Sequence, residues 1–112
     1  MVRGKPLVLR AQARVDVEAA VTWYVDDAGE AGATRFVAEL EQAYARVARQ
    51  PAMGSPRWGH ALSLPALRHW PLKRLPYLVF FVEFDERVEI VRVLHGARDI
   101  PGSLAEPGST GR

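Results

Sequence analysis

The chain has 112 residues, enough for one domain, and its composition excludes several classes of protein. It contains no cysteine, so a disulfide scaffold, a thiolate zinc site and a cysteine nucleophile are excluded. Apolar residues make up 48% of the chain and charged residues 25%, an ordinary globular balance. The longest apolar run, residues 78–82, is too short to span a bilayer, and the N-terminus lacks the apolar segment of a signal peptide. We therefore expect a cytoplasmic protein with no membrane association.

The net charge of +2 hides an uneven distribution of charges along the chain. Between Glu41 and Glu83 there is no acidic residue, and the basic residues of this stretch are Arg46, Arg49, Arg57, Arg68, Lys73 and Arg74, with His60 and His69. A segment with one sign of charge creates a field that favours an anionic partner. The stretch predicts either a solvated basic face or a surface for an acidic peptide or nucleic acid.

The N-terminal half predicts a short strand and then a helix. Leu7-Val8-Leu9 is a short apolar run that favours a strand. Residues 13–27 have apolar side chains at helical spacing on one face. Asp16 and Glu18 are expected in the first turns of this helix, where the helix dipole stabilises negative charge.

A second helix is predicted over residues 33–49, after a break at Gly29 and Gly32. Its apolar residues again fall on one face, and Pro51 ends it. Two amphipathic helices joined by a few residues should form an antiparallel hairpin, because neither can bury its apolar stripe alone.

The C-terminal half predicts a loop and three strands. Residues 53–65 are rich in Gly, Ser and Pro and favour a loop. Residues 67–72 are expected to be extended, with Pro71 favouring an edge position or a strand end. Residues 77–84 are almost continuously aromatic or β-branched, which predicts a buried, central strand. Residues 88–94 alternate, with Val88, Ile90 and Arg92 on one face, and both faces are partly apolar, which also predicts an interior strand.

The predicted fold class is therefore α+β, in the order β-α-α-β-β-β, with the helical hairpin packed on a small, mainly antiparallel sheet. We expect residues 1–106 to form the domain and residues 107–112 to be a disordered tail. The segment beyond Pro101 has few apolar anchors and is expected to be loosely ordered.

No familiar catalytic or cofactor pattern occurs in the sequence. The three histidines, His60, His69 and His95, have no ligand spacing, so no metal is expected. There is no phosphate-binding loop and no Gly-x-Ser-x-Gly elbow, and no cofactor is expected. Metal-free RNA cleavage needs a proton relay and cations beside the scissile phosphate. The residues that could supply such groups are His69, Lys73, Arg74, Tyr77, Arg92, His95 and Arg98.

Three segments resemble the ParE branch of the ParE/RelE toxin superfamily: residues 13–24, residues 33–54 and residues 75–100. The most specific element is Val93-Leu94-His95-Gly96-Ala97-Arg98-Asp99. The resemblance implies a β-α-α-β-β-β fold and a ParD-like antitoxin, whose C-terminal segment wraps the toxin and whose N-terminal part binds operator DNA. It also implies that the protein inhibits DNA gyrase by binding and that the antitoxin neutralises it in a hetero-oligomer. Contact with operator DNA is then expected only through the antitoxin.

Two alternatives remain open. RelE-like relatives are ribosome-dependent endoribonucleases that cut messenger RNA with phosphate-stabilising cations. The corresponding positions here hold His69, Pro71, Leu78 and Ala97, and no tyrosine follows Tyr77. The loss of these cations favours a binding protein over an enzyme. The second alternative is a non-toxic interaction module that acts with its antitoxin as a co-repressor.

Site residues follow from this interpretation. We expect Arg92, His95 and Arg98 to contact the target, with apolar anchors from the hairpin and from Trp58 or Trp70 where these are exposed. We expect the antitoxin to bind through a set of apolar and basic residues, and to carry an acidic tail. These residues are Val25, Val37, Arg46, Arg68 and Arg74.

Overall fold

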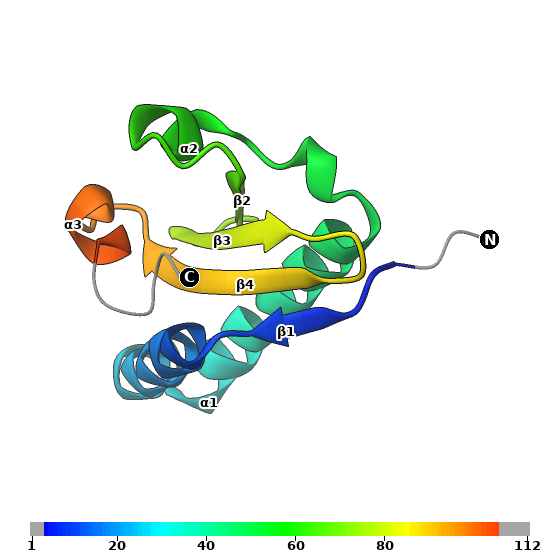
Figure 1. Cartoon of the computed structure of the whole chain (residues 1–112). Coiled ribbons are helices and arrows are strands. Elements are labelled where there is room, and N and C mark those ends of the chain that lie inside the picture. The colour runs from blue at the N-terminus through cyan, green and yellow to red at the C-terminus, as the bar shows by residue number, and fades with distance from the viewer. Residues whose placement is uncertain (1–3, 106–112) are drawn as a thin grey trace.

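The structure, a computed structural model, describes residues 4–105 and has an α+β fold (Figure 1). Its elements are β1 (Leu7–Leu9), α1 (Ala11–Arg49), the 3-10 turn η1 (Pro51–Met53), α2 (Arg57–Ala61), β2 (Leu67–Pro71), β3 (Tyr77–Glu83), β4 (Val88–His95) and α3 (Ile100–Leu104). The sheet order is β1-β4-β3-β2, in which β1 is parallel to β4 and the other pairs are antiparallel. The predicted fold class is confirmed. No helix among the described residues has the length and apolar character needed to cross a bilayer.

The long element α1 consists of two helical arms that meet at Gly29. This glycine has φ 74° and ψ −173°, a conformation outside the helical region that a residue with a Cβ rarely adopts. Across the break, the rings of Tyr24 and Phe36 stack with centroids 5.2 Å apart. Twelve residues of a continuous helix would separate them by about 18 Å, so the chain must reverse. The predicted hairpin is confirmed, although its first arm begins at Ala11 rather than Ala13.

The hairpin covers one face of the sheet with an apolar core. Its core residues, which include Phe36, Leu40 and Val47, pack with Val79, Phe81 and other side chains of the sheet. Burial of these side chains removes the hairpin's apolar stripe from water, which is the main favourable term for the fold. The predicted packing of the stripe on one sheet face is confirmed.

The opposite face of the sheet is covered by two short helices that the sequence patterns did not predict. The expected loop over residues 53–65 contains α2, and the expected loose segment after Pro101 contains most of α3. Ile100 and Leu104 are 3% and 2% exposed, and they belong to a second core with Phe80 and Leu94. Both helices are only five residues long, so a periodic pattern is not visible in them, and tertiary burial stabilises them. The expected tail, residues 107–112, lies outside the described residues.

A β-bulge in β4 changes which side chains face the hairpin. Phe80 pairs with Arg92 but Phe81 pairs with Ile90, so Val91 is an extra residue in β4. Val88 and Ile90 before the bulge and Val93 after it all pack in the core beneath α1. The expected grouping of Val88, Ile90 and Arg92 on one face was therefore wrong beyond Ile90. The alternation of side chains between the two faces of a strand cannot reveal an extra residue inserted into the pairing of two strands.

Asp16 and Arg92 form a buried ion pair where the outer edge of β4 has no strand beside it. The short β1 pairs with β4 only as far as Ile90. Beyond that point, Asp16 Oδ2 accepts a hydrogen bond from the Val93 backbone N–H at 3.0 Å. The same carboxylate accepts bonds from Arg92 Nε at 2.7 Å and Nη2 at 2.8 Å. Arg92 Nη1 donates to the Ser103 carbonyl at 2.7 Å, so one guanidinium joins α1, β4 and α3.

This pair corrects the expected role of Asp16. Asp16 lies in the second turn of α1, so its expected place in the first turns of the helix is confirmed and only its expected role is wrong. The Asp16 and Arg92 side chains are only 4% and 1% exposed. The Asp16 carboxylate does not interact with the helix dipole at the surface. It is the counter-ion of the buried Arg92 guanidinium.

The free edge of β2 is closed to further pairing over most of its length. Ser55 and His69 exchange two backbone hydrogen bonds of 2.9 Å, and Pro71 has no N–H to donate. The predicted edge position of Pro71 is confirmed. His69 is partly enclosed: its Nδ1 is buried without a hydrogen-bond partner among the described residues, and burial, aided by the charge of Arg57, lowers the pKa of His69.

We predict that Asp16→Ala lowers the free energy of unfolding by about 3–5 kcal/mol, because it leaves the Arg92 guanidinium buried without its counter-ion. Urea unfolding measures this loss. The double variant Asp16→Leu with Arg92→Met should recover a large part of it, since no buried charge then remains. A loss below about 1 kcal/mol for Asp16→Ala, the size typical of a surface ion pair, would contradict the structural role of the pair.

The lowered pKa of His69 predicts a pH dependence of stability. The unfolded chain binds a proton at His69 more readily than the folded chain. The contribution of His69 to the free energy of unfolding is therefore fully present above the unfolded pKa of about 6.5, and it decreases as the pH falls below that value. Unfolding measured at about pH 7 and about pH 5.5 should show a smaller decrease for His69→Gln than for the unmodified protein. His60→Gln, at an exposed position, is the control and should behave like the unmodified protein.

Candidate functional site

The structure has a groove at the point where β4 leaves the sheet, which we call the exit groove. It has a volume of about 650 Å³ and lies between the first arm of α1, the start of β3 and the turn after β4. Its lining residues are Gln12, Val15, Asp16, Ala19, Ala20, Trp23, Tyr77, Arg92, Val93, His95, Ala97 and Arg98. All three residues expected to contact a target, Arg92, His95 and Arg98, are therefore brought together in one place.

Arg92 differs from the other two because it lies beneath the groove. Its side chain is 1% exposed and is held by Asp16 and the Ser103 carbonyl. Arg92 can position the walls of the groove, but His95 and Arg98 are the exposed groups that a partner can reach. Because of this burial, Arg92→Ala is expected to destabilise the fold as well as the groove.

His95, Tyr77 and Arg98 form the polar side of the exit groove. The His95 ring packs edge-on against the Tyr77 ring with centroids 5.2 Å apart. His95 Nδ1 accepts a hydrogen bond from the Ala97 backbone N–H at 3.0 Å, so a neutral His95 carries its proton on Nε2. Burial raises the pKa of Tyr77, the nearby Tyr24 raises it further, and Arg98 opposes both. Tyr77 is therefore a neutral hydrogen-bonding group at neutral pH and not a base.

The opposite wall of the exit groove is apolar and exposed. Trp23 is 54% exposed and Val15 is 52% exposed, and with Ala19 they occupy positions four residues apart on one face of the helix. This wall was not predicted from the sequence. The signal was available, since Val15 and Trp23 are large apolar residues off the stripe that buries Ala13, Ala20 and Tyr24. Neither of the two tryptophans considered as anchors, Trp58 and Trp70, lines the exit groove, and both pack partly against the cores.

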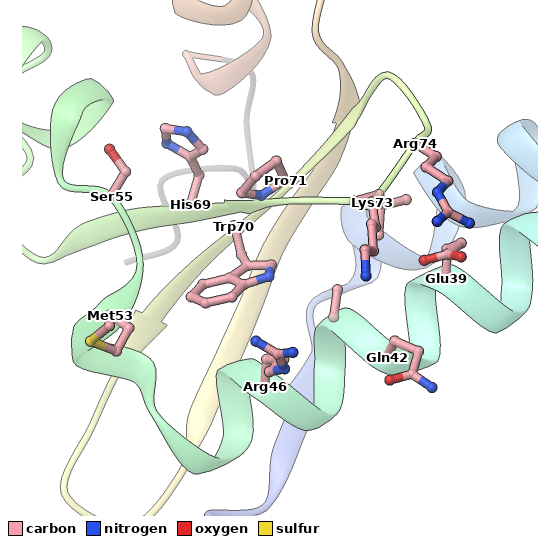
Figure 2. Close-up of a pocket in the computed structure, with 12 residues that line it drawn as sticks. Glu39, Gln42, Arg46, Met53, Ser55, His69, Trp70, Pro71, Lys73 and Arg74 are labelled. Carbon is pink, nitrogen blue, oxygen red and sulfur yellow. The ribbon is translucent and has the colours of Figure 1, made fainter.

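A second groove, which we call the basic groove, lies between the second arm of α1 and the edge strand β2 (Figure 2). It has a volume of about 730 Å³. Its cations are Arg46, Lys73 and Arg74, and Glu39 is its one carboxylate. Figure 2 shows the Trp70 indole pointing from β2 toward α1 and Arg46, so the groove combines positive charge with an aromatic surface.

Only two of the five residues expected to bind an antitoxin line the basic groove. These are Arg46 and Arg74. Arg68 is committed to the fold, because its Nη1 donates to the Gly54 carbonyl at 2.8 Å. Val37 packs against the core, and Val25 is 43% exposed on the first arm of α1 and lines neither groove.

The groups considered for RNA cleavage do not share one site. His69, Lys73 and Arg74 line the basic groove, whereas Tyr77, His95 and Arg98 line the exit groove. Within residues 4–105, no three His, Asp or Glu side chains are grouped so that they could hold a metal ion. Each groove combines apolar surface with cations.

Comparison with known proteins identifies the family. The family model described as the ParE toxin of the type II toxin–antitoxin system parDE matches residues 7–100. Comparison with curated proteins gives no match. Among solved structures, the chain is similar to one described as the chromosomal ParDE TA system from P. aeruginosa, with a TM-score of 0.69 and 20% identity over 81% of this chain and 95% of that chain. That likeness supports the fold, and the family model covers both grooves. This chain belongs to the ParE toxin family of type II toxin–antitoxin systems.

Proposed function

We propose that this protein inhibits DNA gyrase by binding it, and that a ParD-like antitoxin neutralises it by forming a complex with it in the cytoplasm. The observation that carries the proposal is the exit groove. It presents an exposed tryptophan and valine opposite His95 and Arg98, and its floor is fixed by the buried pair of Asp16 and Arg92.

This arrangement has the properties of a binding surface. Exposed aromatic side chains that become buried supply much of the affinity of protein interfaces, and Trp23 is such a side chain. Exposed cations such as Arg98 orient the partner and speed encounter more than they add affinity. A groove with a rigid floor loses less conformational entropy on binding, because its walls are already ordered before the partner binds.

The basic groove is the proposed antitoxin site. Its cations belong to the stretch between Glu41 and Glu83 that has no acidic residue, so an acidic segment meets little repulsion there. Arg46 and Arg74 supply charge, and Trp70 supplies an aromatic surface for an apolar side chain. Any contact of the complex with operator DNA then belongs to the antitoxin.

A RelE-like ribonuclease is the second candidate function, because Tyr77, His95 and Arg98 do share the exit groove. Two observations weigh against it. The raised pKa of Tyr77 keeps its hydroxyl protonated at neutral pH, so little tyrosinate is present to accept a proton. The positions where RelE-like relatives carry cations hold apolar residues such as Leu78 and Ala97.

Pulse labelling after induced expression of the chain alone separates these functions. We expect DNA synthesis to fall before protein synthesis, with filamentation of the cells. Arg98→Gln should relieve the inhibition, because it removes the exposed cation of the exit groove. Arg35→Gln is the matched control, since Arg35 is exposed on the same protein and lines neither groove.

Protein synthesis falling first would favour the ribonuclease over the gyrase inhibitor. If neither synthesis changes while the protein is soluble, the chain is a non-toxic module that acts with its antitoxin. If Arg98→Gln inhibits as strongly as the unmodified chain, the exit groove is not the surface that binds the target.

A further inference from the structure

The two arms of α1 are joined by a single non-helical residue, Gly29. The element runs from Ala11 to Arg49, and only Gly29, with φ 74° and ψ −173°, has backbone angles outside the helical region. If Gly29 adopted helical angles, α1 would be one straight helix of 39 residues, about 58 Å long. The closed hairpin therefore depends on the backbone conformation of one residue.

The conformation of Gly29, and not its packing, is what calls for a glycine. A Cβ at this position would meet no atom of another residue within 4 Å, apart from its two chain neighbours. The combination of positive φ with ψ near 180° is one that essentially only glycine adopts. A residue with a side chain would therefore fit at position 29 without strain only if the helix continued through it.

Gly32 suits the closed hairpin for a different reason. Its φ is not positive, but a Cβ on Gly32 would lie 2.4 Å from the Cβ of Ala28, closer than two such carbons approach in real structures. In a straight helix, Cβ atoms four residues apart are separated by about 5–6 Å, so the clash is absent there. Both glycines therefore fit the bent form of α1, and the straight form requires neither.

Straightening α1 separates two halves of the fold that depend on each other. The ion pair of Asp16 with Arg92 and the stacked rings of Tyr24 and Phe36 both join residues on opposite sides of Gly29. A straight chain alone would expose these surfaces to water. In a pair of straight chains, the first half of each chain can make the same contacts with the second half of its partner, so no buried contact is lost.

We propose that Gly29 is the hinge of a domain exchange, in which two copies of the chain straighten α1 and exchange the segment that contains β1 and the first arm. The two straight helices then run past each other in opposite directions, with their hinges side by side. Gly29 and Gly32 favour the monomer, because both fit the bend better than residues with a side chain do. The partner of the straight form is a second copy of this chain.

The exchange makes the exit groove a site that two chains share. Val15 and Trp23 precede the hinge and come from one chain, whereas His95 and Arg98 follow it and come from the partner. The basic groove stays within one chain, because the second arm of α1 and β2 both follow Gly29. Each dimer therefore has two exit grooves of mixed origin, and the activity of these grooves rests on the proposed function.

Alanine at each glycine tests the hinge. Gly29→Ala disfavours the closed form by roughly tenfold and favours a continuous helix by roughly fivefold. Because both chains of a dimer carry the change, the dimerisation constant should rise by about a thousandfold. Gly32→Ala should shift the equilibrium in the same direction, because its clash is relieved in the straight helix. Light scattering after gel filtration measures the mass of each variant.

Thr34→Ala is the matched control for the two glycine variants. Thr34 is exposed in the second arm, which is helical in both the closed and the straight form. Alanine at this position stabilises the helix equally in both forms, so the variant should have the same mass as the unmodified chain at every concentration.

Isotope-filtered NMR identifies an exchanged dimer. Labelled and unlabelled Gly29→Ala chains are refolded together, and contacts are sought between the Tyr24 ring of one chain and the Phe36 ring of the other. These contacts are expected because the two rings are 5.2 Å apart and lie on opposite sides of the hinge. A dimer without them pairs through another surface and overturns the proposal. Alanine variants that are both monomeric or both unfolded overturn it as well, because the straight form accommodates both methyl groups.

Mixed dimers test the shared groove. One chain carries Gly29→Ala with Trp23→Ala, and the other carries Gly29→Ala with Arg98→Gln, so neither chain alone can form a complete exit groove. In the exchanged heterodimer, one of the two grooves has both Trp23 and Arg98. About half of the gyrase inhibition of the Gly29→Ala dimer should therefore return, and no recovery would overturn the shared groove. If the unmodified chain does not inhibit gyrase, the proposed function fails, and the NMR contacts still decide whether the exchange occurs.

Discussion

The buried ion pair of Asp16 and Arg92 is the interaction on which the rest of the structure depends. Asp16 takes the place of a strand beside β4 by accepting the Val93 N–H, and Arg92 reaches from β4 to the backbone of α3. Burying two charges is expensive, and apolar side chains often stabilise a fold as well as an ion pair does. The hydrogen bonds of this pair are directional. They fix how the first arm of α1 and the turn after β4 lie relative to each other. The exit groove is the space between those two elements.

That geometry is the basis of the proposed binding function. One wall of the exit groove is the face of α1 that carries Val15 and Trp23, and the other is the turn that carries Arg98. A partner that buries the aromatic ring of Trp23 gains affinity from one wall, and the cation Arg98 on the other wall orients the partner. The basic groove, between the second arm of α1 and β2, is a second and more strongly charged surface.

Local patterns in the sequence predicted the features that depend on periodicity. The hairpin, the central position of β3 and the edge position of β2 follow from spacings of a few residues and from Pro71. The features that were missed depend on distant contacts. Asp16 and Arg92 are 76 residues apart, and nothing near Asp16 distinguishes a buried carboxylate from one at the surface. The short helices α2 and α3 exist because the second face of the sheet must be covered, and the bulge at Val91 is invisible to alternation. For the site, the resemblance indicated the turn after β4, but it did not show that Arg92 is buried or that Trp23 is exposed.

The central claim is that this toxin acts through the exit groove by binding gyrase, and a supercoiling assay with purified components tests it most directly. The unmodified chain is titrated against purified gyrase and relaxed plasmid, beside Trp23→Ala and the control Arg35→Gln. The account predicts inhibition by the unmodified chain and by Arg35→Gln, and weak or no inhibition by Trp23→Ala, whose exposed side chain can be removed with little effect on folding. Undiminished supercoiling at every concentration of the folded, unmodified chain would contradict gyrase as the target. Equal inhibition by Trp23→Ala would contradict the exit groove as the binding surface.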